Sequence, residues 1–134
     1  MTDLLIVDDD QDFAGTLRMM LQSRGYDVAM EHDTNNILAR LDQRLPDALI
    51  LDVMFPEDPF AGFELAREIR RRFPKLPILM LTGVRQQFSL EDEAHDPARL
   101  PVTDFVEKPV DFQEFSTKLD RLLGRPTIYT ERGP

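Results

Sequence analysis

Carboxylates directly follow two short apolar runs of the sequence. Asp8 and Asp9 come after residues 4–7, and Asp52 comes after residues 48–51. Continuous apolar runs of this length are typical of strands buried on both faces of a parallel sheet. In an open α/β sheet, ligands bind beyond the carboxyl ends of the strands, which favours a chemical role for an acid at that position. The spacing therefore predicts an acidic site where two strands end.

Two other polar side chains follow apolar runs further along the chain. Thr82 comes directly after residues 78–81, and Lys108 comes directly after Asp104–Glu107. If all these runs belong to one parallel sheet, the residues that follow them lie at the same edge. A lysine side chain is long enough to extend from one strand end toward another. We therefore expect a hydroxyl and an ammonium group close to Asp52.

The predicted acidic site needs a cation, because close carboxylates raise one another's pKa unless positive charge offsets them. Adjacent strands lie about 4.8 Å apart, so Asp8 or Asp9 and Asp52 are expected within reach of one small ion. Mg²⁺ is the natural candidate, since one or two carboxylates and phosphate oxygens usually hold it. An aspartate can carry an aspartyl phosphate. Lys108 and Thr82 can meet the charge on the transferring oxygens.

Apolar runs alternate with segments of helical periodicity along the chain. The predicted strands are residues 4–7, 26–30, 48–51, 78–81 and 104–107. A helix is predicted after each strand, including a brief one within a loop at residues 84–103. The expected fold class is α/β, a doubly wound five-stranded parallel sheet in the order 2-1-3-4-5 with helices on both faces.

Capping residues predict the ends of several helices. Asp10 or Asp12 caps the first helix, and Gly25 ends it. Thr34 is expected to cap a second helix that extends to Leu45.

The later helices carry similar end signals. The third begins at about Phe63 and ends in Arg70-Arg71-Arg72, which we interpret as a solvated helix end whose positive charge suits the helix dipole. Asp111 with Glu114 starts the last helix, and Gly124 ends it.

Composition bounds the class of protein. The 134 residues suit one domain, with 42% hydrophobic and 31% charged residues. No apolar run approaches the roughly 20 residues that cross a bilayer, and no membrane partner is expected. Without cysteine, a cytoplasmic location is the default expectation. The net charge of -9 opposes binding of nucleic acid by this chain. Residues 1–123 are predicted to form the domain, and residues 124–134 a tail or truncated linker.

The site residues together resemble a known family. The motifs are Val7-Asp8-Asp9, Leu51-Asp52 with Pro56, Leu81-Thr82, and Lys108-Pro109. Spread in this order over successive βα units, they closely resemble the receiver domain of bacterial two-component response regulators, from Asp3 to about Leu123. The resemblance implies a flavodoxin-like receiver fold and a phosphorelay function, with phosphate accepted from a sensor histidine kinase or phosphotransfer protein.

The same resemblance implies a role for each matching residue. Asp52 would be the phosphoacceptor. Mg²⁺ would be held by Asp8, Asp9, Asp52 and the backbone carbonyl of Met54. The phosphoryl group would be engaged by Thr82 and Lys108. Phe105 would be the aromatic residue that turns inward on activation, which changes the surface of helix four, strand five and helix five. A downstream protein target and a possible homodimer follow from the same likeness.

Several features depart from the family pattern. The loop after Asp52 reaches Gly62 late and lacks the usual Asp-Gly pair. The segment between Thr82 and Lys108 is long, and Val102-Thr103 stands where a Gly-Ala pair is common. We therefore expect an atypical helix-four region.

Other readings of the same residues remain open. The chain could be a receiver-like interaction module without a working switch. A phosphatase of the haloacid dehalogenase type would need a second Asp at Met54, and the acids that follow the first strand would repel the phosphate of a flavin. Phe105 could be a plain core residue. His32 and His95 are interpreted as surface residues without partners.

Overall fold

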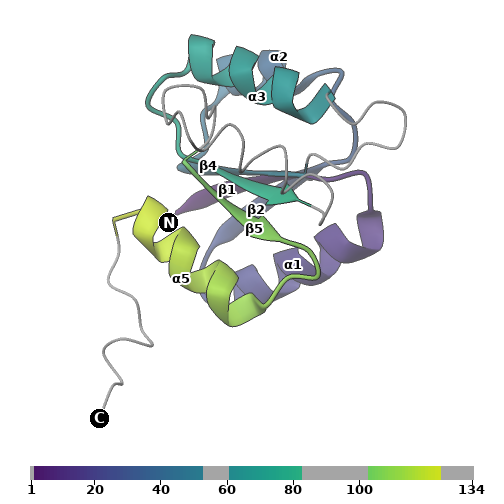
Figure 1. The fold of residues 1–134 in the computed structure, drawn as a ribbon, viewed down its shortest axis with the longest axis vertical. Helices are drawn as coiled ribbons and strands as arrows, with labels where there is room; N and C mark the ends of the chain where they lie inside the picture. The colour runs from purple at the N-terminus through teal and green to yellow at the C-terminus, as the bar shows by residue number, and fades with distance from the viewer. Residues whose placement is uncertain (1, 53–60, 83–102, 125–134) are drawn as a thin grey trace.

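A five-stranded parallel sheet lies between two layers of helices in the computed structural model (Figure 1). The strands are β1 (Asp3–Val7), β2 (Asp27–Glu31), β3 (Ala48–Asp52), β4 (Ile78–Thr82) and β5 (Asp104–Glu107). The helices are α1 (Gln11–Ser23), α2 (Ile37–Gln43), α3 (Ala61–Arg72) and α5 (Phe112–Leu122). The structure describes residues 2–52, 61–82 and 103–124.

The strand order is β2-β1-β3-β4-β5, and every neighbouring pair is parallel. This order confirms the predicted doubly wound fold. β1 and β3 are neighbours, and Val7 pairs with Leu51 at the ends of their ladder. Thr82 pairs with Glu107 at the ends of β4 and β5. The residues that follow these pairs therefore emerge together at the carboxyl edge of the sheet.

The core consists of one apolar layer on each face of the sheet. All five residues of β3 are buried, as are all five of β4. Leu49 and Leu51 pack toward α2 and α3, whereas Ala48 and Ile50 pack toward α1 and α5. The two helix layers are seen above and below the sheet in Figure 1. Covering both faces explains why the inner strands are continuous apolar runs.

Local signals fix the ends of α1 and α5. Asp10 is the N-cap of α1, and its Oδ1 accepts a hydrogen bond from the Phe13 N–H at 3.0 Å. Asp111 caps α5 by accepting hydrogen bonds from the second and third helical N–H groups. After these helices, Gly25 and Gly124 have φ of 92° and 68°, a conformation that glycine adopts without the steric cost of a Cβ. The predicted caps and stops of both helices are confirmed.

The predicted bounds of the second helix are wrong at both ends. The helix begins at Ile37 after Asn36, which makes no side-chain capping hydrogen bond, and Thr34 contributes only its backbone oxygen. The helix ends at Gln43, and Leu45 lies beyond it with 49% of its surface exposed. Pro46 follows Leu45, and a residue before proline is disfavoured in the helical region of φ and ψ. The backbone is accordingly extended at Arg44, before the chain reaches Pro46.

Arg70 is more than a solvated helix end. Its guanidinium donates hydrogen bonds to the backbone oxygens of Pro74 and Leu76, at 2.9 and 3.1 Å, and to Thr103 Oγ1 at 3.2 Å. Burial lowers the pKa of this guanidinium. Its side chain therefore ties the end of α3 to the residue that leads into β5.

Two predictions lie outside the described residues: the brief helix at 84–103, with the atypical helix-four region, and nearly all of the 124–134 tail. The division into a 1–123 domain and a tail stays a prediction. Among the helices in the described ranges, none has the length and apolar character that spanning a membrane requires.

Candidate functional site

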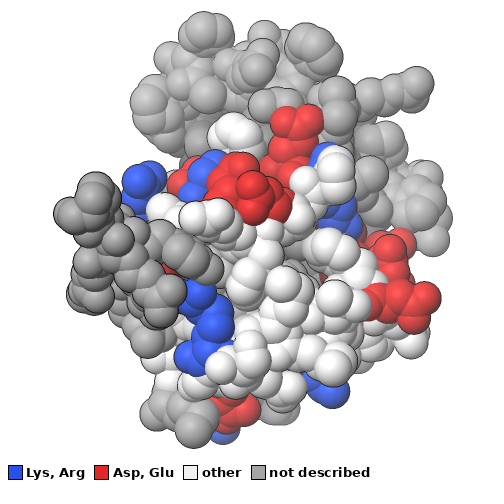
Figure 2. Space-filling model, turned by 90° about the horizontal axis from the view of Figure 1, so that it is seen from below, with Lys and Arg blue, Asp and Glu red and all other residues white. Residues whose placement is uncertain are grey.

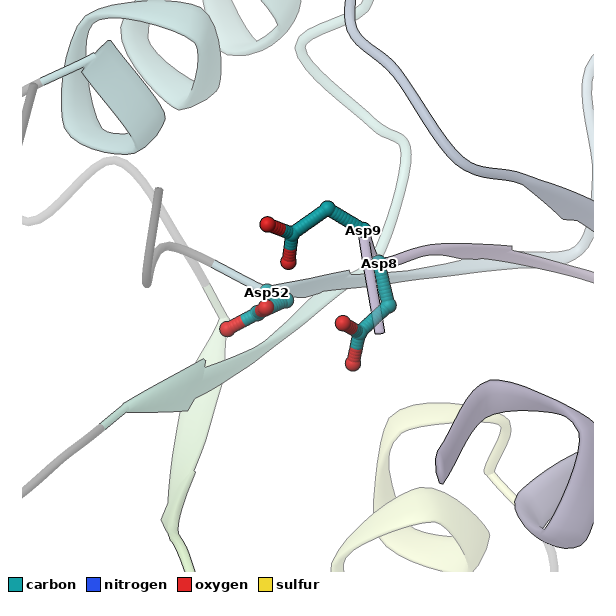
Figure 3. Close-up of side chains that lie close together, drawn as sticks. All are labelled: Asp8, Asp9 and Asp52. Carbon is teal, nitrogen blue, oxygen red and sulfur yellow. The ribbon is translucent and has the colours of Figure 1, made fainter. Parts of the chain in front are cut away.

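Three carboxylates converge at the carboxyl edge of the sheet. Asp8 and Asp9 follow β1, and Asp52 ends β3, directly beside it. Each offers an oxygen, and these oxygens all lie within 4.8 Å of one another. Figure 3 shows the three carboxylate groups pointing toward the same space beyond the strand ends. The structure thus brings together the three acids that the sequence placed in one site.

Burial differs sharply among these acids. Asp8 and Asp52 are 0% and 1% exposed, whereas Asp9 is exposed. Burial raises the pKa of Asp8 to about 6, and a hydrogen bond with Asp52 and the charge of Asp52 act in the same direction. The Asp10 N–H, which donates to Asp8 Oδ1 at 2.9 Å, lowers that pKa, as does the Lys108 ammonium. The site therefore stores electrostatic repulsion that a cation would relieve.

The ammonium of Lys108 faces both buried acids. Lys108 Nζ lies 3.3 Å from Asp8 Oδ2 and 3.5 Å from Asp52 Oδ2. The lysine side chain is 19% exposed, so the pair is shielded from water on most sides. The peptide bond from Lys108 to Pro109 is cis. The lysine extends from the end of β5 across β4 to the acids on β1 and β3, as its position in the sequence led us to expect.

Thr82 lies at the end of β4, between the strand of Asp52 and the strand that leads to Lys108. The residue is 0% exposed, and its Oγ1 has no hydrogen-bond partner among the described residues. A buried hydroxyl without a partner costs free energy, so the Thr82 hydroxyl fits a site in which a ligand oxygen accepts its hydrogen bond.

Phe105 lies on the edge strand β5 and is half-buried against the apolar layer of α2 and α3. Lys118 on α5 donates a hydrogen bond to the Phe105 backbone oxygen at 2.7 Å. The Lys118 ammonium also lies 5.3 Å from the centroid of the Phe105 ring. Phe105 therefore joins β5 to α5 at the edge of the sheet.

Sequence reasoning missed two side chains beside the site. His32 was expected at the surface without a partner, but it is half-buried and its Nδ1 lies 3.2 Å from the backbone oxygen of Asp8. Val7 pairs with Glu31 at the ends of β1 and β2, so the residues that follow them, Asp8 and His32, lie side by side. The sequence alone gives no signal for this register. The second is Phe13, whose ring centroid lies 4.4 Å from Lys108 Nζ.

The donor set fits a hard divalent cation. Mg²⁺ prefers oxygen ligands and is commonly held by one or two carboxylates together with water and phosphate oxygens. Here one exposed and two buried carboxylates each bring an oxygen within 4.8 Å of the others. The backbone carbonyl of Met54, expected from the resemblance to complete the ligands, lies outside the described residues.

Comparison with known proteins agrees with this geometry. Residues 4–120 match the family described as response regulator receiver domain. Response regulator MprA of Mycobacterium ulcerans (strain Agy99) is 34% identical over 128 residues, which are 93% of this chain and 51% of the relative. The alkaline phosphatase synthesis transcriptional regulatory protein PhoP of Bacillus subtilis (strain 168) is 30% identical, covering 93% of this chain and 50% of PhoP. The chain thus spans about half the length of the curated relatives it matches.

A solved structure shows the same fold. The receiver domain of NtrX from Brucella abortus superimposes with a TM-score of 0.77 at 27% sequence identity. The match covers 92% of this chain and 100% of the NtrX domain. The sheet order and helix layers described above are therefore those of a receiver.

Proposed function

This chain belongs to the response regulator receiver domain family, and from that premise we propose that it is a phosphoacceptor switch of a two-component phosphorelay. Asp52 accepts a phosphoryl group from the histidine of a sensor kinase or phosphotransfer protein. The observation that supports this most is the gathering of three carboxylates within 4.8 Å, with the Lys108 ammonium 3.5 Å from Asp52.

The transfer exchanges one bond to phosphorus for another. An oxygen of the Asp52 carboxylate attacks the phosphorus of a phosphohistidine, and the new O–P bond forms as the P–N bond breaks. The electron pair of the broken bond leaves on the imidazole nitrogen. In this proposal the chain assists its own phosphotransfer and the later hydrolysis, and it is not an enzyme acting on a separate substrate.

We assign the metal ligands to Asp8, Asp9, Asp52 and the carbonyl of Met54. When bound, Mg²⁺ supplies positive charge to the phosphoryl oxygens. Asp8 and Asp52 bring buried carboxylates, and Asp9 brings an exposed one. The raised pKa of Asp8 supports this assignment, because a bound cation would favour the ionised form of its carboxyl.

Lys108 and Thr82 hold the phosphoryl oxygens in this proposal. The Lys108 ammonium already points between the two buried acids. The Thr82 hydroxyl, for which no partner is found in the described part of the chain, gains an oxygen to which it can donate. Phe105 and the surface of β5, α5 and the helix-four region then change with phosphorylation. That surface would contact a downstream protein target or a second copy of the chain.

Protein partners fit the charge of this chain better than nucleic acid does. PhoP is described as a transcriptional regulatory protein. The net charge of -9 opposes contact of this chain with the phosphate backbone of a nucleic acid. We therefore propose that it acts through protein contacts. The cytoplasmic location expected from the cysteine-free sequence stays a prediction.

Labelling with acetyl phosphate tests the proposal directly. With Mg²⁺ present, intact-protein mass spectrometry is expected to show one phosphoryl group on the wild-type chain and none on Asp52→Asn. Asp12→Asn, which removes an exposed acid from the first turn of α1, is the matched control and should label normally. The proposal would be contradicted if the wild-type chain stayed unmodified and also took up no beryllofluoride with Mg²⁺. The chain would then be interpreted as an interaction module without a working switch.

A further inference from the structure

The aromatic ring of Phe13 faces the ammonium group that the proposed function uses. Lys108 Nζ lies 4.4 Å from the centroid of this ring. The same nitrogen lies 3.3 Å from Asp8 Oδ2 and 3.5 Å from Asp52 Oδ2. The face of an aromatic ring attracts a cation within about 6 Å of its centroid. The ammonium is therefore held by two carboxylates and one ring.

A closed series of contacts fixes the ring in this place. Asp8 Oδ1 accepts a hydrogen bond from the Asp10 N–H at 2.9 Å, and Asp10 Oδ1 accepts one from the Phe13 N–H at 3.0 Å. The Phe13 ring contacts Lys108 Nζ, which returns to Asp8 Oδ2. The N-cap of α1 thus sets the position of the ring relative to the carboxylate that the lysine also contacts.

The Phe13 ring has no proposed role in binding the metal or the phosphoryl group, whereas the carboxylates that contact Lys108 do. The oxygens that Lys108 contacts on Asp8 and Asp52 belong to the groups proposed to hold a cation and to receive the phosphoryl group. A lysine side chain has a flexible stem and loses rotamer entropy when its ammonium is held in one place. The neutral ring keeps its attraction for the ammonium whichever state the carboxylates are in.

We propose that Phe13 is a positioning residue for phosphoryl transfer, whose ring keeps the Lys108 ammonium directed at Asp52. In this role the ring acts through the lysine and takes no part in the bond changes at phosphorus. This inference rests on the proposed function, because it concerns how the same site is kept ready.

An ordinary core role for Phe13 has a matched control within the chain. Phe13 is half-buried and packs against the apolar layer of α1 and α5. Phe112 is also half-buried and packs against the same layer, where it stacks on Phe115. No cation–π contact of Phe112 is found in the described part of the chain. Phe13→Leu and Phe112→Leu therefore remove comparable apolar contacts, but only the first removes the ring from the lysine.

Nuclear magnetic resonance of the metal-free protein can detect the contact between Phe13 and Lys108 without a measurement of phosphorylation. The sequence contains three lysines, Lys75, Lys108 and Lys118, so ¹³C labelling of lysine side chains gives few signals. The ring current of Phe13 should displace the ε-methylene signal of Lys108. We expect that displacement to disappear in Phe13→Leu, to remain in Phe13→Tyr, and to be unaffected in Phe112→Leu. The signals of Lys75 and Lys118 serve as internal references.

The rate of labelling by acetyl phosphate with saturating Mg²⁺ measures the effect of the Phe13 ring on phosphoryl transfer. Phe13→Leu should slow labelling about fivefold, in keeping with the strength of a partly buried cation–π contact. Phe13→Tyr, which keeps a ring face, should stay within about twofold of wild type. Phe112→Leu should label at the wild-type rate. Thermal unfolding of each variant identifies any that has lost its fold.

Two outcomes would overturn the inference. One is a Lys108 signal and a labelling rate that are both unchanged in Phe13→Leu. The other is equal slowing in Phe13→Leu, Phe13→Tyr and Phe112→Leu, which would make Phe13 a core residue only. Failure of the proposed function looks different, because the wild-type chain itself would then take up no phosphoryl group.

Discussion

At the scale of single residues, Asp8 carries the largest electrostatic cost of the site. Its side chain is 0% exposed, and burial is the main reason why its pKa rises to about 6. In the unfolded chain this carboxyl has an ordinary pKa near 3.8. At a pH between these two pKa values, the Asp8 carboxyl binds a proton in the folded protein but not in the unfolded chain. The burial cost of ionised Asp8 is therefore present above pH 6 and is relieved as the pH falls toward 4.

Asp8→Asn is expected to stabilise the metal-free protein at pH 7. Asn keeps an oxygen for the Asp10 N–H but carries no charge, so the free energy of unfolding should rise by about 2 kcal/mol. The advantage over wild type should shrink as the pH falls through about 6 and vanish near pH 4. Urea unfolding at pH 7, 5.5 and 4 in a chelator checks this.

The exposed acid Asp27 provides the charge control for that comparison. Asp27→Asn removes one negative charge without touching the site. A stability advantage of Asp8→Asn that grows as the pH falls would contradict the burial argument, and so would a wild-type protein that is the more stable at pH 7.

At the scale of helices and strands, Arg70 joins α3 to the start of β5. Three acceptors surround its guanidinium, two of them backbone oxygens. Thr103, one of the three, also accepts a hydrogen bond at its Oγ1 from the Ile78 N–H at the start of β4, at 3.0 Å. This junction holds the two strands whose other ends carry Thr82 and Lys108.

Arg70→Lys is expected to lower the free energy of unfolding by about 1.5 kcal/mol. A lysine ammonium cannot reach several acceptors in the fixed geometry of a guanidinium, so some of the three oxygens, of which that of Leu76 is partly buried, lose their partner. Arg71→Lys is the control, because Arg71 is exposed and pairs with Glu68 on the helix surface. Arg71→Lys should lower the free energy of unfolding by less than about 0.5 kcal/mol. Chemical denaturation of both variants measures the difference, and equal costs would refute the role of the junction.

The N-cap of α5 gives a second test at this scale. Asp111 lies three residues after Lys108, and its Oδ1 accepts a hydrogen bond from the Gln113 N–H at 2.9 Å. Asp111→Ala should cost about 1 kcal/mol of stability, whereas Asp111→Asn, which still caps, should cost little. Thermal unfolding monitored by circular dichroism separates these outcomes. An alanine variant as stable as wild type would mean that the cap does not support α5.

At the scale of the whole molecule, the distribution of charge distinguishes the acidic site from the side formed by α1 and α5. The acidic site lies at the carboxyl edge of the sheet, where the chain concentrates buried negative charge. The side formed by α1 and α5 has a largely uncharged central area (Figure 2). Met19 and Met20 of α1 are exposed, at 68% and 36%. An uncharged surface of this kind suits contact with a protein better than contact with nucleic acid.

Mg²⁺ is expected to stabilise the entire fold, because a ligand that binds only the folded state shifts the unfolding equilibrium. At about 100 times its Kd the gain is about 2.7 kcal/mol. The melting temperature of the wild-type chain should therefore rise with MgCl₂, and that of Asp52→Asn should rise much less. NaCl at equal ionic strength controls for screening of the net charge of -9. Equal rises with both salts would show that no specific site is filled.

The strands, their order and the acids at their ends could be predicted from the order of the amino acids. Buried parallel strands need unbroken apolar runs, and runs such as residues 48–51 mark them without reference to any partner. The caps at Asp10 and Asp111 are equally local, because a side chain there binds N–H groups two or three residues away.

Contacts between side chains of different elements became apparent only in the packed fold. The contact of Phe13 with Lys108 and that of His32 with Asp8 join residues far apart in the chain. The three acceptors of Arg70 are likewise gathered by the packing of α3 against the sheet. Helical and strand periodicities state which face of an element is apolar. They do not state which polar group of another element lies opposite, because that depends on register and on the angle at which helices pack.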